Sequence, residues 1–286
     1  MRFGLYPRTR VVWNPSRILR VEEQLPTSCG TYRVITDQGE GYLKAIPKNL
    51  SPNVLACELV GTRVASWLGL NTVEHVIFDL DPDLVLFDDP PIRGLAFLSK
   101  GIEGHPWGGS EDELSDLENP DHLAGLVVLD TLLRNRDRHF AKDEKESVED
   151  PYKRKLDNVF LAHASKGKLS VIALDQSDCL CASRELHPAL NNIQQYKCSR
   201  IYGLFPEFRS RVTRPQFRNF LSRLEQLNYS AAEAVTRDIP IEWQVSQDMT
   251  KNVAKYLVER SQFLVDHFEQ VLVANGVLQG VLKGLS

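Results

Sequence analysis

The sequence predicts an α+β fold with two lobes, a β-rich lobe over residues 1–100 and an α-helical lobe over residues 101–286. Short apolar runs separated by turn residues fill the first hundred positions, which favours strands. Apolar residues at helical spacing dominate from about residue 215 onward. Polar motifs lie near the junction between these two parts, so we expect a functional site there.

The N-terminal part is expected to contain a β-hairpin followed by one helix. Residues 32–36 and 42–46 flank the turn sequence Asp37–Gly41, which predicts the hairpin. A helix is expected over residues 53–68, and Gly69 suits the position just after a helix end. Short strands are expected after it over residues 73–78, 84–87 and 94–98.

The C-terminal part is expected to be mostly helical, with one strand pair. Asn119, Pro120 and Asp121 predict a helix start, with a cap residue, a proline at the first position and an acid in the first turn. The charged segment 143–155 is expected to be an exposed loop. The apolar segments 158–161 and 169–174 are expected to pair as strands, and the clearest amphipathic helix falls within residues 253–272.

Composition narrows the class of protein. The net charge of -4 leaves no basic footprint for direct contact with nucleic acid. No apolar run reaches the ~18 residues of a membrane span, and Met1–Arg8 is not followed by the apolar run of a signal peptide. We therefore expect a cytoplasmic protein without a membrane partner. The odd count of five cysteines argues against a disulfide framework, and Cys179 and Cys181 lack a second pair at metal-ligand spacing.

Lys44 and Glu58 are the first candidate site residues. Lys44 stands in the middle of an apolar strand, and Glu58 shares a helix face with Val54, Gly61 and Ala65. A carboxylate on an inward face is costly unless it is paired, and the strand lysine is a natural partner. The alternative is that Lys44 extends to solvent from an edge strand and Glu58 faces water.

Asp137 lies in the loop Asn135–His139, directly after the helical run. A carboxylate in such a loop can accept or orient a hydroxyl proton, a contribution typically worth ~10²–10⁴-fold in rate. The alternative is a solvated turn residue paired with Arg136 or Arg138. His139 is a second candidate catalytic group, or a structural hydrogen-bonding residue that holds the loop.

Asn158 and Asp175 are the candidate metal ligands. Asn158 begins one predicted strand and Asp175 ends the next, and their neutral and anionic oxygens suit a hard Mg²⁺ ion that also binds phosphate. Turn chemistry alone would also explain both residues, because Asn and Asp favour strand ends. Asp157 competes with Asn158 as a ligand, and Asp178 competes less well with Asp175. Taken in order, Lys, Glu, Asp, Asn and Asp across a β lobe and then an α lobe are the groups that phosphoryl transfer from Mg-ATP requires.

The chain resembles HipA-like kinases, an atypical branch of the protein-kinase-like fold related to the phosphoinositide lipid kinases. The matching segments span residues 25–180: Tyr42–Ile46, Leu55–Gly61, Leu68–Leu70, Asn135–His139, Asp157–Phe160 and Leu174–Asp175.

The resemblance implies a role for each matching residue. Lys44 would contact ATP phosphates and Glu58 would orient it, Asp137 would be the catalytic base, and Asn158 and Asp175 would bind Mg²⁺. The backbone around Phe97, Leu98 and Ser99, up to Lys100, would hold adenine, and Ser28–Gly30 would cover the phosphates. The chain departs from the family in the insertion before Asn158, in Gln176–Ser177 after the metal aspartate, and in lacking a Gly-x-Gly-x-x-Gly motif.

The expected function is therefore an ATP- and Mg-dependent serine/threonine kinase acting on a protein. The resemblance also implies an antitoxin or other regulatory partner. The alternatives are a pseudokinase that binds nucleotide without turnover, a kinase acting on a lipid or small molecule, and a structural protein.

Overall fold

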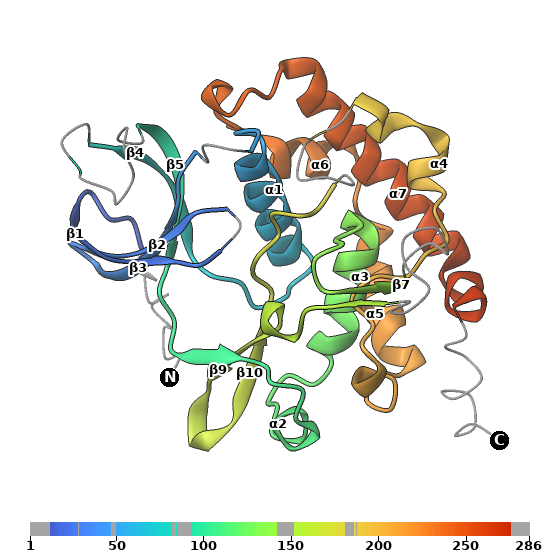
Figure 1. Cartoon of the computed structure of the whole chain (residues 1–286). Helices are drawn as coiled ribbons and strands as arrows, with labels where there is room; N and C mark the ends of the chain where they lie inside the picture. Colours follow the sequence, from blue (N-terminus) through green and yellow to red (C-terminus); the bar gives the residue numbers. More distant parts are fainter. Residues whose placement is uncertain are drawn as a thin grey trace, which may run out of the picture.

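The computed structural model describes residues 12–27, 29–46, 50–81, 84, 93–141, 152–180, 186 and 188–275. Within them, the main sheet has five strands in the order β1-β2-β3-β5-β4, and every neighbouring pair is antiparallel. Figure 1 shows this sheet on one side of α1 and the larger helices on the other. The strands are β1 (Ile18–Leu25), β2 (Thr31–Thr36), β3 (Gly39–Lys44), β4 (His75–Leu80) and β5 (Gly94–Lys100).

A second, smaller sheet begins where the first one ends. After Lys100 the chain enters β6, which pairs with β9, and β9 pairs with β10. A separate two-stranded ladder joins β7 to β8. These strands are β6 (Gly104–Pro106), β7 (His139–Ala141), β8 (Tyr152–Arg154), β9 (Phe160–His163) and β10 (Leu169–Ile172).

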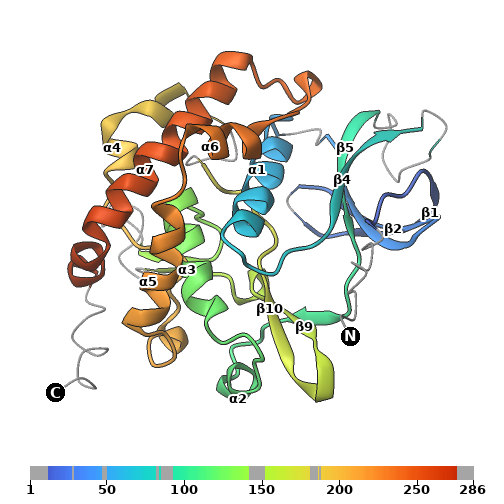
Figure 2. The ribbon, with the colours of Figure 1, turned by 180° about the vertical axis from the view of Figure 1, so that it is seen from behind.

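Helices make up most of the C-terminal part. The long α7 packs against α6, α5 and α3, and the view from behind shows it running along the whole helical part (Figure 2). The helices are α1 (Val54–Trp67), α2 (Glu111–Ser115), α3 (His122–Leu133), α4 (Ile193–Tyr196), α5 (Arg214–Leu224), α6 (Tyr229–Thr236) and α7 (Gln247–Ala274). None of the helices within the described ranges has the length and apolarity needed to span a bilayer.

Two hydrophobic clusters place α1 at the centre of the molecule. One face of the sheet buries a small cluster that includes Trp13, Tyr32, Leu43 and Leu98. The other face is covered by α1, whose apolar residues belong to the same large cluster as the C-terminal helices. Because α1 is buried on nearly all sides, Glu58 on this helix has little access to water.

The predicted α+β fold is confirmed, and most elements lie where the sequence places them. Helix α1 begins one residue inside the predicted range and is followed by Gly69, which has φ +76°. Strand β4 lies two residues later than predicted, and β1 was not predicted. The predicted strand 84–87 falls outside the described residues except for Leu84. The division into domains at residue 100 stays a prediction, since α1 shares its core with the helical part.

Two local predictions are wrong. Helix α3 begins at His122, and Asn119 does not cap it. Instead, the Asn119 side chain exchanges hydrogen bonds of 3.1 and 2.9 Å with the backbone of Val171 on β10. The end of the charged segment is a strand rather than a loop, because β8 pairs with β7.

Candidate active site

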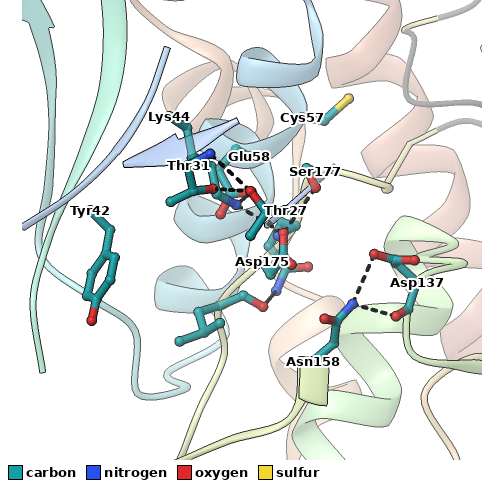
Figure 3. A network of polar contacts seen from close by, with 12 residues as sticks. Thr27, Thr31, Tyr42, Lys44, Cys57, Glu58, Asp137, Asn158, Asp175 and Ser177 are labelled. Carbon is teal, nitrogen blue, oxygen red and sulfur yellow. Dashed lines mark hydrogen bonds and ion pairs between the residues drawn. The ribbon is translucent and has the colours of Figure 1, made fainter. Parts of the chain in front are cut away.

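Lys44, Glu58 and Asp175 form one cluster, called here the cleft cluster. Lys44 Nζ donates to Glu58 Oε2 at 2.8 Å and to Asp175 Oδ1 at 3.0 Å (Figure 3). The residues come from the end of β3, from α1 and from the segment after β10. The backbone N–H of Gln176 also donates to Glu58 Oε2, at 3.0 Å. The predicted pair of Lys44 and Glu58 is present. Asp175, 131 positions after Lys44 in the sequence, adds a second carboxylate to this pair.

The charges in the cleft cluster stabilise one another against burial. Burial opposes the charged form of Lys44, but the carboxylates of Asp175 and Glu58 outweigh it and raise the pKa of the lysine. Burial likewise opposes the charged form of Asp175, yet Lys44 lowers the pKa of this carboxyl well below its usual range. For Glu58, burial outweighs Lys44 and raises the pKa. The lysine cation and the Asp175 carboxylate are therefore the firmly charged members.

Asp175 adopts an unusual backbone conformation. Its φ of +56° is in the left-handed region, which Asp tolerates better than most residues. Ser177 Oγ donates to Asp175 Oδ1 at 3.0 Å, and Lys44 contacts the same oxygen. These two contacts leave the second carboxylate oxygen to other ligands. A residue held in such a conformation is typical of functional sites.

Asp137 is buried beside Asn158. Its side chain is 5% exposed, which does not agree with a solvated turn residue. Asn158 Nδ2 donates to the backbone oxygen of Asp137 at 2.6 Å and to its Oδ2 at 3.0 Å. Asn135 Oδ1 accepts from the Asp137 N–H at 2.9 Å, and Lys155 Nζ contacts Asp137 Oδ1 at 2.9 Å. The candidate base is therefore held from its backbone and from its side chain.

Arg138 connects the segments that carry the candidate metal ligands. Its guanidinium pairs with Asp130 on α3, and both side chains are fully buried. It also donates to the backbone oxygen of Asn158 at 2.9 Å and to that of Leu174, next to Asp175. Burial raises the pKa of Asp130 to about 6 in spite of this arginine. We call Arg138, Asp130 and the two carbonyl groups the buried cluster.

His139 lies on β7, with its ring against Phe205 at 5.2 Å between centroids. Burial, together with Arg154 and Arg209, lowers its pKa to about 4, so the imidazole is neutral near pH 7. It does not line the cavity beside Lys44 and Asp175. The structure thus gives His139 a packing position, and its catalytic role stays a prediction.

A cavity of about 380 Å³ opens beside the cleft cluster. Its apolar wall includes Tyr42, Val73, Phe97, Phe160 and Leu174. The predicted residues Lys44, Glu58, Phe97, Ser99 and Asp175 all line it. Apolar walls with a few convergent charged groups are typical of small-molecule sites.

The other predicted residues, Asp137, Asn158, Leu98 and Gly30, are not among the residues that line the cavity. The side chain of Leu98 belongs to the cluster on the other face of the sheet, and its backbone lies between β3 and β4, paired with Leu43 and Val76, so the structure does not support the predicted contact of Leu98 with adenine. Gly30 lies in the turn between β1 and β2 with φ +63°, and its neighbours Thr27, Cys29 and Thr31 line the cavity. Thr27 Oγ1 accepts from the Thr31 N–H at 3.0 Å, which closes this turn.

The amide oxygen of Asn158 and the carboxylate of Asp175 are donor types that Mg²⁺ prefers, and their role as its ligands stays a prediction. Since the amide nitrogen of Asn158 faces Asp137, its oxygen is turned away from that residue (Figure 3). In the described part of the chain, no group of three or more His, Cys, Asp or Glu side chains is arranged to hold a metal. Mg²⁺ at nucleotide sites typically takes one or two protein ligands and completes its shell with phosphate and water, which matches this pair. The competing Asp157 is exposed, whereas Asn158 is buried against Asp137.

Lys155 and Gln176 are two of the site residues that the sequence did not predict. The backbone N–H of Gln176 donates to Glu58. The side-chain oxygen of Gln176 accepts a hydrogen bond of 3.2 Å from Asn135 Nδ2. Lys155 lies in the segment that the sequence assigns to an exposed loop. Its only sequence signal is a position three residues before Asn158, which is too weak to single it out.

Comparison with solved structures identifies the architecture. The crystal structure of the Helicobacter pylori proinflammatory kinase CtkA is similar to this chain with a TM-score of 0.56. The similarity covers 89% of this chain and 96% of that one, at 14% sequence identity. The chain has a kinase-like fold. No protein-family model matches the sequence, and no curated protein sequence matches it either.

The kinase-like fold is consistent with the arrangement of the site. An N-terminal antiparallel sheet is followed by a mostly helical part, and the cavity lies between strands β3 and β5 and the segment after β10. This similarity does not test the resemblance to HipA-like kinases, because 14% identity supports the fold alone.

Proposed function

We propose that this protein is an ATP-dependent phosphotransferase that moves the γ-phosphoryl group to a hydroxyl. The observation that carries the proposal is the cleft cluster: a buried lysine held by two carboxylates at the edge of an apolar cavity. In phosphoryl transfer the protein contributes mainly positioning and electrostatic stabilisation, and this set of groups supplies both.

In this proposal, Lys44 binds the α- and β-phosphates, and Glu58 keeps its ammonium group in place. Phe97, Tyr42 and the backbone near Ser99 enclose the adenine. The turn around Gly30 covers the phosphates. Asp137 orients the acceptor hydroxyl and takes its proton as the bond to phosphorus forms. Mg²⁺ bound to Asn158 and Asp175 would neutralise charge on the phosphate oxygens.

The acceptor is proposed to be a serine or threonine of a protein. This finer assignment, like an antitoxin or other regulatory partner, depends on the resemblance of the sequence motifs to HipA-like kinases. The similarity to a proinflammatory kinase is compatible with a protein acceptor and does not identify one.

The test is transfer of labelled γ-phosphate from Mg-ATP to the protein itself or to proteins of a lysate. We expect Asp137→Asn to reduce transfer by about 10²–10⁴-fold, because the proton acceptor is lost. The matched control is Asp116→Asn, which removes an exposed carboxylate paired with Lys168 at 3.2 Å. Equal transfer by wild type and Asp137→Asn would overturn the role of Asp137.

The rival functions give different results in the same experiment. Stabilisation of the wild type by Mg-ATP without any phosphate transfer would identify a nucleotide-binding protein without turnover. Label recovered in lipid or small-molecule fractions would change the acceptor class. Absence of nucleotide binding, together with a silent Lys44→Ala variant, would overturn the proposed function as a whole.

A further inference from the structure

One segment of the helical part contacts both of the elements that hold the Lys44–Glu58 pair in place. It runs from the end of α6 through the short 3-10 helix η5 (Ile241–Trp243), and we call residues 235–243 the bridging segment. In Figures 1 and 2 the chain leaves α6 beside α1 and turns toward β5. The bridging segment therefore lies against the helix that carries Glu58 and against the strand that pairs with the strand of Lys44.

Trp243 binds β5 close to the position of Lys44. Strand β3 ends at Lys44, whose partner on β5 is Phe97. Leu95 lies two residues past that pair, beyond the register of β3, and its carbonyl accepts a hydrogen bond of 2.8 Å from the indole N–H of Trp243. The tryptophan is fully buried in the large hydrophobic cluster. It thus fixes β5 where the ladder with β3 has ended.

Arg63 ties α1 to the other end of the bridging segment. It follows Glu58 by five residues, or about one and a half turns of the same helix. Its guanidinium donates to the backbone oxygen of Val235 at 3.4 Å and to that of Arg237. Because one end of the segment holds α1 and the other holds β5, the segment sets how the strand of Lys44 lies on the helix of Glu58.

The backbone of the bridging segment is held in a defined conformation. Asp238 has φ +58°, and Gln244, directly after the segment, has φ +57°. Positive φ is uncommon for residues other than glycine and persists where the surrounding contacts determine it. The backbone N–H of Trp243 also donates to the backbone oxygen of Pro240 at 3.1 Å. The segment is therefore a fixed connection between α1 and β5, as well as a link from α6 to α7.

We propose that Trp243 and Arg63 are positioning residues that keep Lys44 beside Glu58 before a nucleotide binds, an inference that rests on the proposed function. Neither residue lines the cavity, so both act through the elements that they hold. The distance of 2.8 Å between Lys44 Nζ and Glu58 Oε2 depends on how the sheet lies on α1. If only a fraction of the molecules has this pair assembled, the apparent affinity for nucleotide falls in proportion to that fraction. The bridging segment keeps the fraction high without help from a second protein.

The test measures the affinity for Mg-ADP by calorimetry in Trp243→Phe, which keeps an aromatic ring and removes the N–H donor. We expect a loss of about fivefold, the effect of one neutral hydrogen bond on the balance between assembled and separated pairs. The matched control is Trp107→Phe, because Trp107 is also buried and its indole N–H donates to the carbonyl of Ser110 at 2.9 Å. Its affinity for ADP should equal that of the wild type. Arg63→Met is a second variant, which removes the contact on the side of α1 and should lose affinity as Trp243→Phe does.

A double variant distinguishes positioning of the pair from general packing. Effects that act through one interaction are not additive. Trp243→Phe should therefore have almost no effect on the affinity for ADP in a Glu58→Gln background, where the pair is already altered. A loss that persists at full size in that background would overturn the inference, and so would equal affinities of the wild type and Trp243→Phe.

Hydrogen exchange tests the positioning role without a nucleotide. Failure of the wild type to bind Mg-ADP would overturn the proposed function. The amide hydrogens of α1 should even then exchange about fivefold faster in Trp243→Phe than in Trp107→Phe, because the same hydrogen bond opposes local opening. Equal exchange rates for α1 in these two variants would overturn the positioning role as well.

Discussion

The cleft cluster and the buried cluster are both built around one basic side chain, yet they have different surroundings. Lys44 holds two carboxylates at the wall of a cavity, where its side chain keeps 14% exposure. Arg138 is fully buried with Asp130, and its other partners are carbonyl groups of the site segments. The first cluster has charge that a ligand can reach, and the second has charge that only positions the backbone. Loss of the first should affect catalysis, and loss of the second should affect stability as well.

The largest effect is expected from Arg138→Met, which leaves Asp130 buried without its cation. Removing one partner of a buried pair typically costs about 3–5 kcal/mol of the free energy of unfolding. Denaturant unfolding of the variant measures this loss. Phosphate transfer should fall too, because the backbone at Asn158 and Leu174 loses its shared donor.

A double variant separates the two effects of Arg138. In Arg138→Met with Asp130→Leu, stability should largely recover, because an apolar pair replaces the ion pair. Transfer should stay low, since the carbonyl groups of Asn158 and Leu174 still lack the arginine that joins them. Recovery of transfer would show that the buried cluster contributes only stability. Arg260→Met is the control, because this buried arginine donates to the carbonyl groups of Thr131 and Tyr196 and not to those of Asn158 and Leu174.

A smaller effect is expected from Glu58→Gln in the cleft cluster. Burial raises the pKa of Glu58, so the neutral amide removes a desolvation cost, and the free energy of unfolding should change by about 1 kcal/mol or less. The kcat/KM for ATP should fall about tenfold or more, because Lys44 loses a charged partner. Steady-state kinetics and denaturant unfolding check the two parts. The control Glu23→Gln alters an exposed pair with Arg33, at 3.5 Å, and should change neither.

The smallest effect concerns His139, next to the buried cluster. Its pKa is about 4 in the folded protein and about 6.5 in the unfolded chain, so the unfolded state binds the proton first as the pH falls. Its contribution to stability is complete above about pH 6.5 and is lost on acidification toward pH 4. Between pH 6.5 and 5.5 we expect the wild type to lose up to about 1 kcal/mol more than His139→Gln. Parallel stability curves for the two proteins from pH 7.5 to 5 would contradict this expectation.

Structural features that depend only on contacts between residues close in sequence were predicted well. Helix α1 follows from apolar spacing and from Gly69, and the inward position of Glu58 follows from its i±4 relations within that helix. Strand β1 was missed because half of its sequence, ILRVEEQL, is polar and its residues are exposed or half-buried. The start of α3 was misplaced because the partner of Asn119 is Val171, 52 residues away.

The sequence by itself determined the order of a β-rich and an α-helical part and the residue types that phosphoryl transfer needs. Local periodicity and turn chemistry carry that information, and both act over a few residues. Only the tertiary structure decided that Asp175 reaches Lys44 across 131 positions, that Arg138 connects Asn158 to Leu174, and that Lys155 lies on Asp137. Such contacts depend on how the sheets and helices pack together, which no short segment of the chain specifies.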